Sequence, residues 1–284
     1  KMTDNQQKAP KETSTKRKVF IFTAQDGRVG KTTACKMFIH NMQQVLKQQP
    51  IVVDTDPMNP NVARSYIPEI VKCWGTSTAT AQKGAARFLR DRGNKAVIDT
   101  NTTEGKINKI LSSQIVFDGE HHVAQSILAL TEFNRDVVVN VSGNTYIQMC
   151  NFLASQQADK LDDLDLYICW VTNGTKESLD LFIKTQRDFD GAKYLLIFNE
   201  GNTQYIKNWD NYYLTPEIGK LVSDGKIKII SLPLLSVPPD FWHEHQNLPY
   251  TQWLKNESID KYRRNSIQIW IDTACQEITE SKCL

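Results

Sequence analysis

The chain has 284 residues, of which 40% are hydrophobic and 23% are charged, with a formal net charge of +2. This composition is ordinary for a globular α/β protein, and no apolar run approaches the roughly 18 residues of a membrane span. Six cysteines form no C-x-x-C pair, so a disulfide scaffold is not indicated and we expect a cytoplasmic protein with reduced thiols.

Residues 1–18 differ from the rest of the chain. They carry six Lys/Arg against two acidic residues and contain no aromatic or β-branched apolar residue. Such a segment buries too little surface to offset its ordering entropy, so we predict a disordered basic tail before a single domain at 19–284. The tail either solubilises the protein or makes a weak electrostatic contact with nucleic acid or anionic lipid.

The strongest motif is the stretch from Val19 to Thr33, which reads VFIFTAQDGRVGKTT. Four apolar residues predict a buried strand, a glycine-bearing turn follows, and G-K-T-T begins a predicted helix that ends near Lys47. Backbone N–H groups at a helix N-terminus bind phosphate, a lysine reaches the outer phosphates, and a threonine hydroxyl coordinates magnesium. The strict pattern has glycine in place of Gln25, but the strand and helix around the loop predict a nucleotide site.

Two aspartates follow the next predicted strand, at residues 51–53. Asp54 and Asp56 belong to the segment Asp-Thr-Asp-Pro. Ligands bind outside the carboxyl ends of parallel strands, so both carboxylates should face the phosphate loop. One would approach the metal and the other the attacking water. A plain turn is the alternative interpretation, since Asp and Pro favour turns.

The sequence between residues 58 and 114 is less informative. A short helix is predicted at 107–112. If their segment is helical, Lys83, Arg87 and Arg90 share one face. That face is either solvated or a basic contact surface.

A further strand is predicted at 136–141 and ends near Asn140, where phosphate-loop proteins usually place an aspartate that holds the water shell of magnesium. An amide brings no charge, so metal binding or hydrolysis should be weaker. Other strands are predicted at 115–118, 166–171, 194–198 and 227–230, and a last helix at about 255–280. The alternation predicts an α/β fold with a doubly wound, mostly parallel sheet of about seven strands flanked by helices.

Five segments follow one another in an order and spacing that are typical of one protein family: QDGRVGKTT, DTDP, VVVNVSG, FNEG and SLPLL. With them the chain resembles the ParA/MinD group of deviant-Walker P-loop ATPases over roughly residues 18–250. Within that group it looks most like the plasmid stability and conjugation branch of StbB, MobD and TraL-like proteins. The resemblance implies ATP or ADP and Mg²⁺ as cofactors. It also implies a homodimer, a partner protein of a plasmid partition or transfer system, and nonspecific DNA as a further partner.

The resemblance also assigns residues to roles. Lys31 and Asp56 would be catalytic, and Thr32 and Asp54 would serve the metal. Asn199 would meet the adenine edge. The residues that would bind the nucleotide are Gly27, Arg28, Val29, Gly30, Lys31, Thr32, Thr33, Asn199 and Pro233.

Several positions depart from the family pattern. The first lysine of the family loop, which reaches the partner's phosphates in dimers, is Asp26 here, and a carboxylate repels phosphate. The second glycine is Arg28, whose guanidinium would supply positive charge. Met58 replaces the usual glutamine or glycine, and Asn140 replaces the aspartate.

Three functions fit these residues. The first is a slowly hydrolysing, nucleotide-dependent switch in plasmid stability, partition or conjugative transfer. The second is a pseudo-ATPase adaptor that binds a partner protein or DNA without hydrolysis, which Asp26 and Asn140 favour. The third is a ligase of the dethiobiotin synthetase type, for which no acceptor site is visible. Membrane docking through the last helix, as in MinD relatives, is disfavoured because Asp272, Glu277 and Glu280 accompany its apolar stripe.

Overall fold

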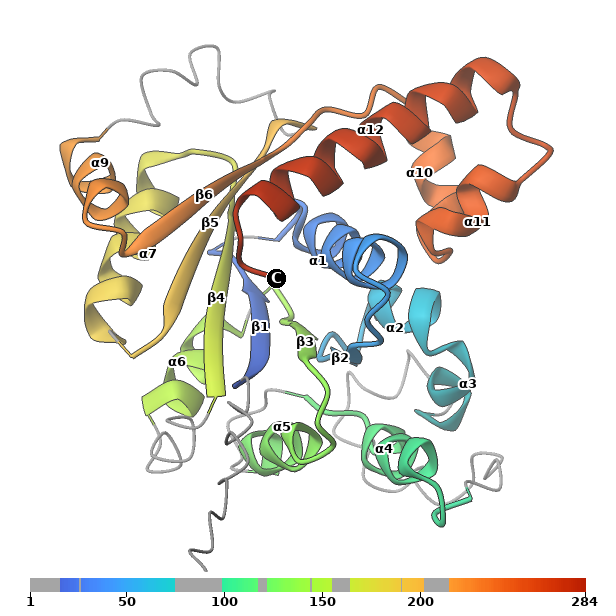
Figure 1. Ribbon diagram of the computed structural model, residues 1–284, viewed down its shortest axis with the longest axis horizontal. Helices are drawn as coiled ribbons and strands as arrows, with labels where there is room; N and C mark the ends of the chain where they lie inside the picture. The colour runs from blue at the N-terminus through green and yellow to red at the C-terminus, as the bar shows by residue number, and fades with distance from the viewer. Residues whose placement is uncertain are drawn as a thin grey trace, which may run out of the picture.

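The computed structural model describes residues 16–25, 27–74, 99–116, 122–143, 145–154, 164–189, 191–201 and 215–284. Over these residues the predicted α/β class is confirmed: one parallel sheet has helices on both faces (Figure 1). The sheet holds six strands in the order β2-β3-β1-β4-β5-β6. Their bounds are β1 Arg17–Thr23, β2 Ile51–Asp54, β3 Val137–Asn140, β4 Leu164–Thr172, β5 Lys193–Asn199 and β6 Ile227–Leu232.

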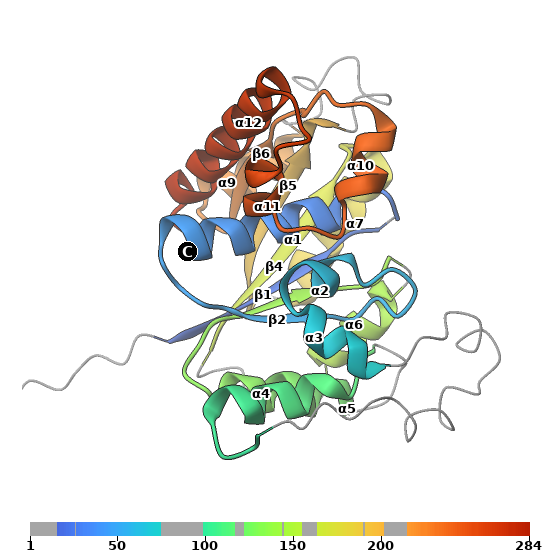
Figure 2. The same ribbon diagram turned by 90° about the vertical axis from the view of Figure 1, so that its right-hand side faces the viewer.

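Two helical layers cover the sheet. On one face, α1 (Lys31–His40) and α12 (Lys261–Glu280) pack beside α10 (Pro239–His245) and α11 (Tyr250–Lys255), as Figure 2 shows. The other face is covered by α4 Thr103–Ser112, α5 His122–Thr131, α6 Tyr146–Ala154, α7 Lys176–Asp188 and α9 Pro216–Ser223. Shorter elements are the π-helix Asn41–Val45, α2 Asn61–Tyr66, α3 Pro68–Val71 and the 3-10 turn Lys72–Trp74.

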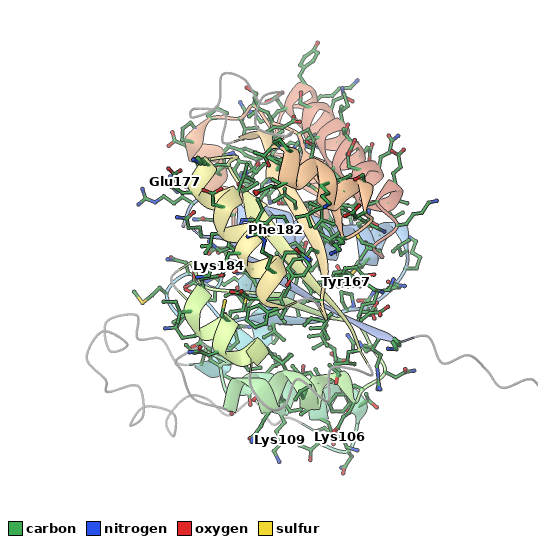
Figure 3. The ribbon with its side chains drawn as sticks, turned by 90° about the vertical axis from the view of Figure 1, so that its left-hand side faces the viewer. Lys106, Lys109, Tyr167, Glu177, Phe182 and Lys184 are labelled. Atoms are coloured by element: carbon green, nitrogen blue, oxygen red, sulfur yellow. The ribbon has the colours of Figure 1, made fainter. Side chains whose placement is uncertain are left out.

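The strands are apolar on both sides because both faces of the sheet are buried. In β1, Phe20 and Phe22 pack toward α1, and the Phe22 ring centre lies 5.0 Å from that of Phe38. Val19 and Ile21 alternate to the opposite core. On that opposite face, Phe182 of α7 is buried against the sheet, whereas Glu177 and Lys184 lie on the outer side of the helix (Figure 3).

The strand order places β1 at a switch point. The connection from β1 to β2 uses α1 on one face, whereas α6 and α7, which follow β3 and β4, lie on the other face. Loops that leave neighbouring strands toward opposite faces open a crevice at the carboxyl edge of the sheet, where ligands of open α/β folds bind. The end of β1 is therefore the expected ligand site.

The structure differs from the sequence predictions at several boundaries. The sheet begins at Arg17 rather than at Val19, because Arg17 pairs with Leu164 across β1 and β4. Residues 115–116 are not in a strand, and the described residues contain six strands against about seven predicted. The predicted helix at 107–112 is confirmed as part of α4. Residues 1–15 of the predicted tail and the predicted basic segment at 83–95 lie outside the described residues.

The last predicted helix, at about 255–280, is observed as α12, which begins later than predicted. α11 ends at Lys255 and α12 begins at Lys261, because the Asp260 side chain accepts the N–H of Arg263 at 2.9 Å and caps the new helix. The apolar stripe of α12 packs against α1 and β6, as expected. Among the helices that the structure describes, none is long and apolar enough to cross a membrane.

Candidate functional site

The loop between β1 and α1 leaves the start of α1 without a side-chain cap. Gly30 is the N-cap residue at φ 97°, and it has no side chain that could accept an N–H of the first turn. The first N–H groups of a helix then need an outside acceptor, and an anion serves well. Arg28 also has a positive φ, 64°, a conformation that glycine adopts more easily. A glycine, which the family resemblance implies at this position, would adopt this backbone conformation more easily.

Lys31 is the first residue of α1 and is 8% exposed. The end of β3 approaches it closely, since a Cβ atom added to Gly143 would lie 3.6 Å from Lys31 Nζ and 3.3 Å from Gly27 Cα. The loop, the lysine and the segment after β3 therefore meet at one place, as predicted from the strand ends. Thr32 and Thr33 follow in the first turn of α1, each half-buried.

Asp54 at the end of β2 is buried and accepts four hydrogen bonds. Its Oδ2 accepts the N–H groups of Val62 and Ala63, both at 3.0 Å, which fixes the start of α2. Its Oδ1 accepts the N–H of Asp56 at 3.3 Å and Asn140 Nδ2 at 2.9 Å. Burial raises the pKa of Asp54 to about 6, against the effect of these bonds. Four donors fill a carboxylate, so a direct bond to a metal ion would replace one of them.

Asp56 has a different environment. Its Oδ1 accepts the N–H groups of Met58 and Asn59, each at 3.0 Å, in the turn that leads away from β2. The side chain is half-buried, whereas Asp54 is 2% exposed. Of the two aspartates predicted here, Asp56 is therefore the one that a water molecule reaches more easily.

Asn140 at the end of β3 is 2% exposed. It lies opposite Asp54 in the sheet register, and its Nδ2 donates to that carboxylate. Its Oδ1 is buried and has no hydrogen-bond partner, which is unusual for a buried polar atom. The sequence had indicated only a missing charge at this position. The structure adds that a carboxylate, Asp54, lies on the neighbouring strand β2 and that the Asn140 amide donates a hydrogen bond to it.

Magnesium, which the family resemblance implies, fits this donor set. Thr32 would offer a hydroxyl and Asn140 Oδ1 an acceptor for a metal-bound water. Within the described ranges, no three or more His, Cys, Asp or Glu residues are grouped so that they could hold a metal ion. The metal would rely on phosphate oxygens and water for its remaining ligands, as Mg²⁺ commonly does.

Asn199 and Pro233, predicted near the base, lie at the ends of β5 and β6. Asn199 Nδ2 donates to the carbonyl of Val29 at 2.9 Å, inside the phosphate loop. The carbonyl of Pro233 accepts Trp270 Nε1 at 2.7 Å, which ties this loop to α12. Asp26, the position of the missing family lysine, lies outside the described residues.

Lys36 was not singled out by the sequence. It lies on α1, is 2% exposed, and its Nζ donates to the carbonyls of Gln246 at 3.0 Å and Leu248 at 2.7 Å. The ammonium group lies 5.0 Å from the ring centre of Tyr250, whose hydroxyl donates to the Thr33 carbonyl at 3.3 Å. Burial lowers the pKa of Lys36 to about 7. These contacts attach α1 to the α10–α11 segment, and no local sequence pattern predicts them.

Three large apolar side chains are exposed at the carboxyl edge of the sheet. Met58 follows β2 and is 40% exposed, Ile147 begins α6 after β3 and is 68% exposed, and Leu234 follows β6 and is 53% exposed. They border the same edge as the phosphate loop. Met58 and Leu234 follow the two outermost strands, so these side chains are spread along the edge and do not form one patch.

Solved structures of plasmid partition proteins are similar to this chain in overall fold. A plasmid partition protein of Borrelia burgdorferi B31, bound to AMPPNP, is 15% identical, with a TM-score of 0.45 over 91% of this chain and 98% of that one. The pNOB8 ParA structure is 10% identical, with a TM-score of 0.46 over 93% and 96%. No protein-family model and no curated protein matches the chain.

Proposed function

We propose that the chain binds ATP or ADP with Mg²⁺ at residues 27–33 and acts as a ParA/MinD-like switch in plasmid stability, partition or conjugative transfer. The observation that carries this proposal is the uncapped start of α1. It follows a loop in which Arg28 and Gly30 have positive φ angles, and it lies at the switch point of the sheet. The helix begins with Lys31, which is largely buried. A site with these parts binds a polyphosphate.

Each residue then has a role that its position supports. Lys31 would neutralise the outer phosphates, the N–H groups from Gly27 to Thr33 would cradle them, and Arg28 would add positive charge at the mouth of the loop. Thr32 would ligate Mg²⁺, which when bound offsets the charge of the phosphates. Asp56 would orient an attacking water. Asp54, whose carboxylate already accepts four hydrogen bonds from the protein, would position α2 and Asn140 at the edge of the site.

A homodimer is the assembly that we propose for this switch. The exposed Met58, Ile147 and Leu234 border the nucleotide edge, so a second copy or a partner protein that covers this edge would sense the bound nucleotide. Movement of the Asp54–Asp56 loop would then change affinity for that partner or for DNA.

A second function is favoured by one observation. Asn140 supplies no charge at the end of β3, and its amide is used to hold Asp54. A protein arranged in this way would bind nucleotide well and turn it over slowly or not at all. The non-hydrolysing adaptor, which binds a partner protein or DNA, is therefore the alternative.

Calorimetric titration with ATP and ADP, with Mg²⁺ and with EDTA, tests the proposal. We expect binding that Mg²⁺ strengthens and that Lys31→Ala reduces at least 100-fold, because a phosphate-facing cation is lost. Lys106→Ala is the matched control, since Lys106 projects from α4 into solvent (Figure 3). Equal binding by wild type and Lys31→Ala would reject the site. A phosphate-release assay, with and without DNA, then separates the switch from the adaptor.

A further inference from the structure

Asn199 reaches the phosphate loop from a strand that is not next to it. β5 is separated from β1 by β4, yet Asn199 Nδ2 donates to the carbonyl of Val29 at 2.9 Å across 170 residues of sequence. Its Oδ1 accepts the N–H of Gly201 at 3.2 Å. A donor group faces a carbonyl and an acceptor faces an N–H, so the orientation of this amide is determined by its two partners.

The contact with the loop is tight. A Cβ atom added to Gly30 would lie 2.1 Å from Asn199 Nδ2, a separation that no real side chain allows. Gly30 also has φ 97°, a conformation that favours glycine independently. The loop is therefore closed against Asn199 at the point where α1 begins.

The bond to Val29 controls an N–H that phosphate would use. The carbonyl of Val29 and the N–H of Gly30 belong to one planar trans peptide and point in opposite directions. Because Asn199 holds the carbonyl, it also fixes the direction of the Gly30 N–H. That N–H stands at the uncapped start of α1 beside Lys31.

We propose that Asn199 is a positioning residue for the phosphate loop, which it holds in the form that receives the phosphate chain. This inference rests on the proposed nucleotide binding. It differs from the base-edge role that the family resemblance implies. Loss of a residue that contacts the base lowers affinity only for ligands that have a base. Loss of a residue that positions the loop lowers affinity for any ligand with a phosphate chain, including one without a base.

Binding of inorganic tripolyphosphate in the presence of Mg²⁺ separates the two roles. For Asn199→Ala we expect affinity for both tripolyphosphate and ATP to fall by about two- to tenfold, the effect of one neutral hydrogen bond. The matched control is Asn173→Ala: Asn173 follows β4 at the same sheet edge, but its side chain accepts the N–H of Thr175. This control should bind both ligands as wild type does.

A loss of ATP affinity with unchanged tripolyphosphate affinity would overturn the inference in favour of a base-reading role. Unchanged affinity for both ligands would overturn it as well. If wild type binds neither ligand, the proposed nucleotide function fails first, and the inference fails with it.

Hydrogen exchange of the ligand-free protein gives a readout that does not depend on binding. We expect amides of residues 27–33 to exchange faster in Asn199→Ala than in wild type or Asn173→Ala, while amides of β4 stay protected in all three. Protected β4 amides show that the variant is folded. Equal exchange at residues 27–33 in folded Asn199→Ala and wild type would show that Asn199 does not hold the loop.

Discussion

Replacing Lys36 by methionine tests the buried ammonium group that joins α1 to the α10–α11 segment. Methionine keeps much of the side chain's length and apolar volume, but it cannot donate to the carbonyls of Gln246 and Leu248. It also removes a charge that lies 5.0 Å from the ring centre of Tyr250. The substitution thus removes a buried cation and leaves two carbonyl groups without their donor.

The magnitude follows from the pKa of Lys36, which burial lowers from 10.5 to about 7. At 1.36 kcal/mol per pKa unit, the charged form is about 5 kcal/mol less favourable in the folded protein than in water. Between pH 7 and 10.5 the unfolded chain binds a proton that the folded chain has lost. The contribution of Lys36 to the free energy of unfolding therefore rises with pH in this window, by up to about 1.4 kcal/mol per unit.

Lys36→Met lacks this dependence, whereas nearby titrating groups such as Cys35 and His40 are present in both proteins. We expect wild type to gain stability relative to Lys36→Met by about 2 kcal/mol between pH 7 and pH 9. At low pH the relief of the buried charge roughly offsets the two lost hydrogen bonds, each worth about 1–3 kcal/mol.

Urea titrations of both proteins at pH 6, 7, 8 and 9 measure the shift. Lys109→Met is the control, since Lys109 is exposed on α4 (Figure 3) and is solvated in the folded and unfolded chain alike. Its stability should follow the wild-type pH dependence. A difference between wild type and Lys36→Met that is the same at pH 6 and pH 9 would refute the reasoning.

Two further predictions concern the site edge. Asn140→Asp places a second carboxylate about 2.9 Å from Asp54 Oδ1, and should lower the free energy of unfolding by about 3 kcal/mol at pH 8. The loss should be smaller at pH 5, where one of the two carboxyl groups binds a proton; an equal loss in urea titrations at both pH values would contradict this. Ile147→Asp should change stability by less than about 0.5 kcal/mol, because the side chain is 68% exposed. The same variant should weaken nucleotide-dependent self-association in sedimentation, and association equal to wild type would exclude this edge as the dimer surface.

The sheet could be predicted from the sequence because its strands are continuous apolar runs, buried on both faces. Ile115, in the strand predicted at 115–118, shows the limit of that rule, whereas residues 117–118 lie outside the described residues. Ile115 is buried in the same core as residues of α4 and α5, but it is not in a strand. A short apolar run indicates that a segment is buried, but a buried loop can have the same pattern as a buried strand. The break before α12 was missed for a related reason, since Ile259 is buried in the connection and continues the apolar pattern.

The strand, loop and helix from β1 to α1 could be predicted because all three lie within a short stretch of sequence. The contacts that surround them could not, because each joins residues far apart. Asn140 and Asp54 are 86 residues apart, and Lys36 and Gln246 are 210 apart. Spacing along the chain carries no information about such pairs. Residue type indicates a distant partner only for Lys36, because a buried lysine needs acceptors, and its burial is known only from the structure.

The pair of Asp54 and Asn140 changes how the departure at the end of β3 is understood. Two carboxylates at hydrogen-bond distance in a buried site repel, so one of them would have to hold a proton. An amide at position 140 avoids this and supplies the fourth donor that the Asp54 carboxylate accepts. The other oxygen of Asp54 holds the N–H groups of Val62 and Ala63 at the start of α2. A ligand that binds the unpartnered Asn140 Oδ1 would therefore act on α2 through the Asp54 carboxylate. In the proposed nucleotide site, the same amide would link the ligand to the loop that carries Asp56.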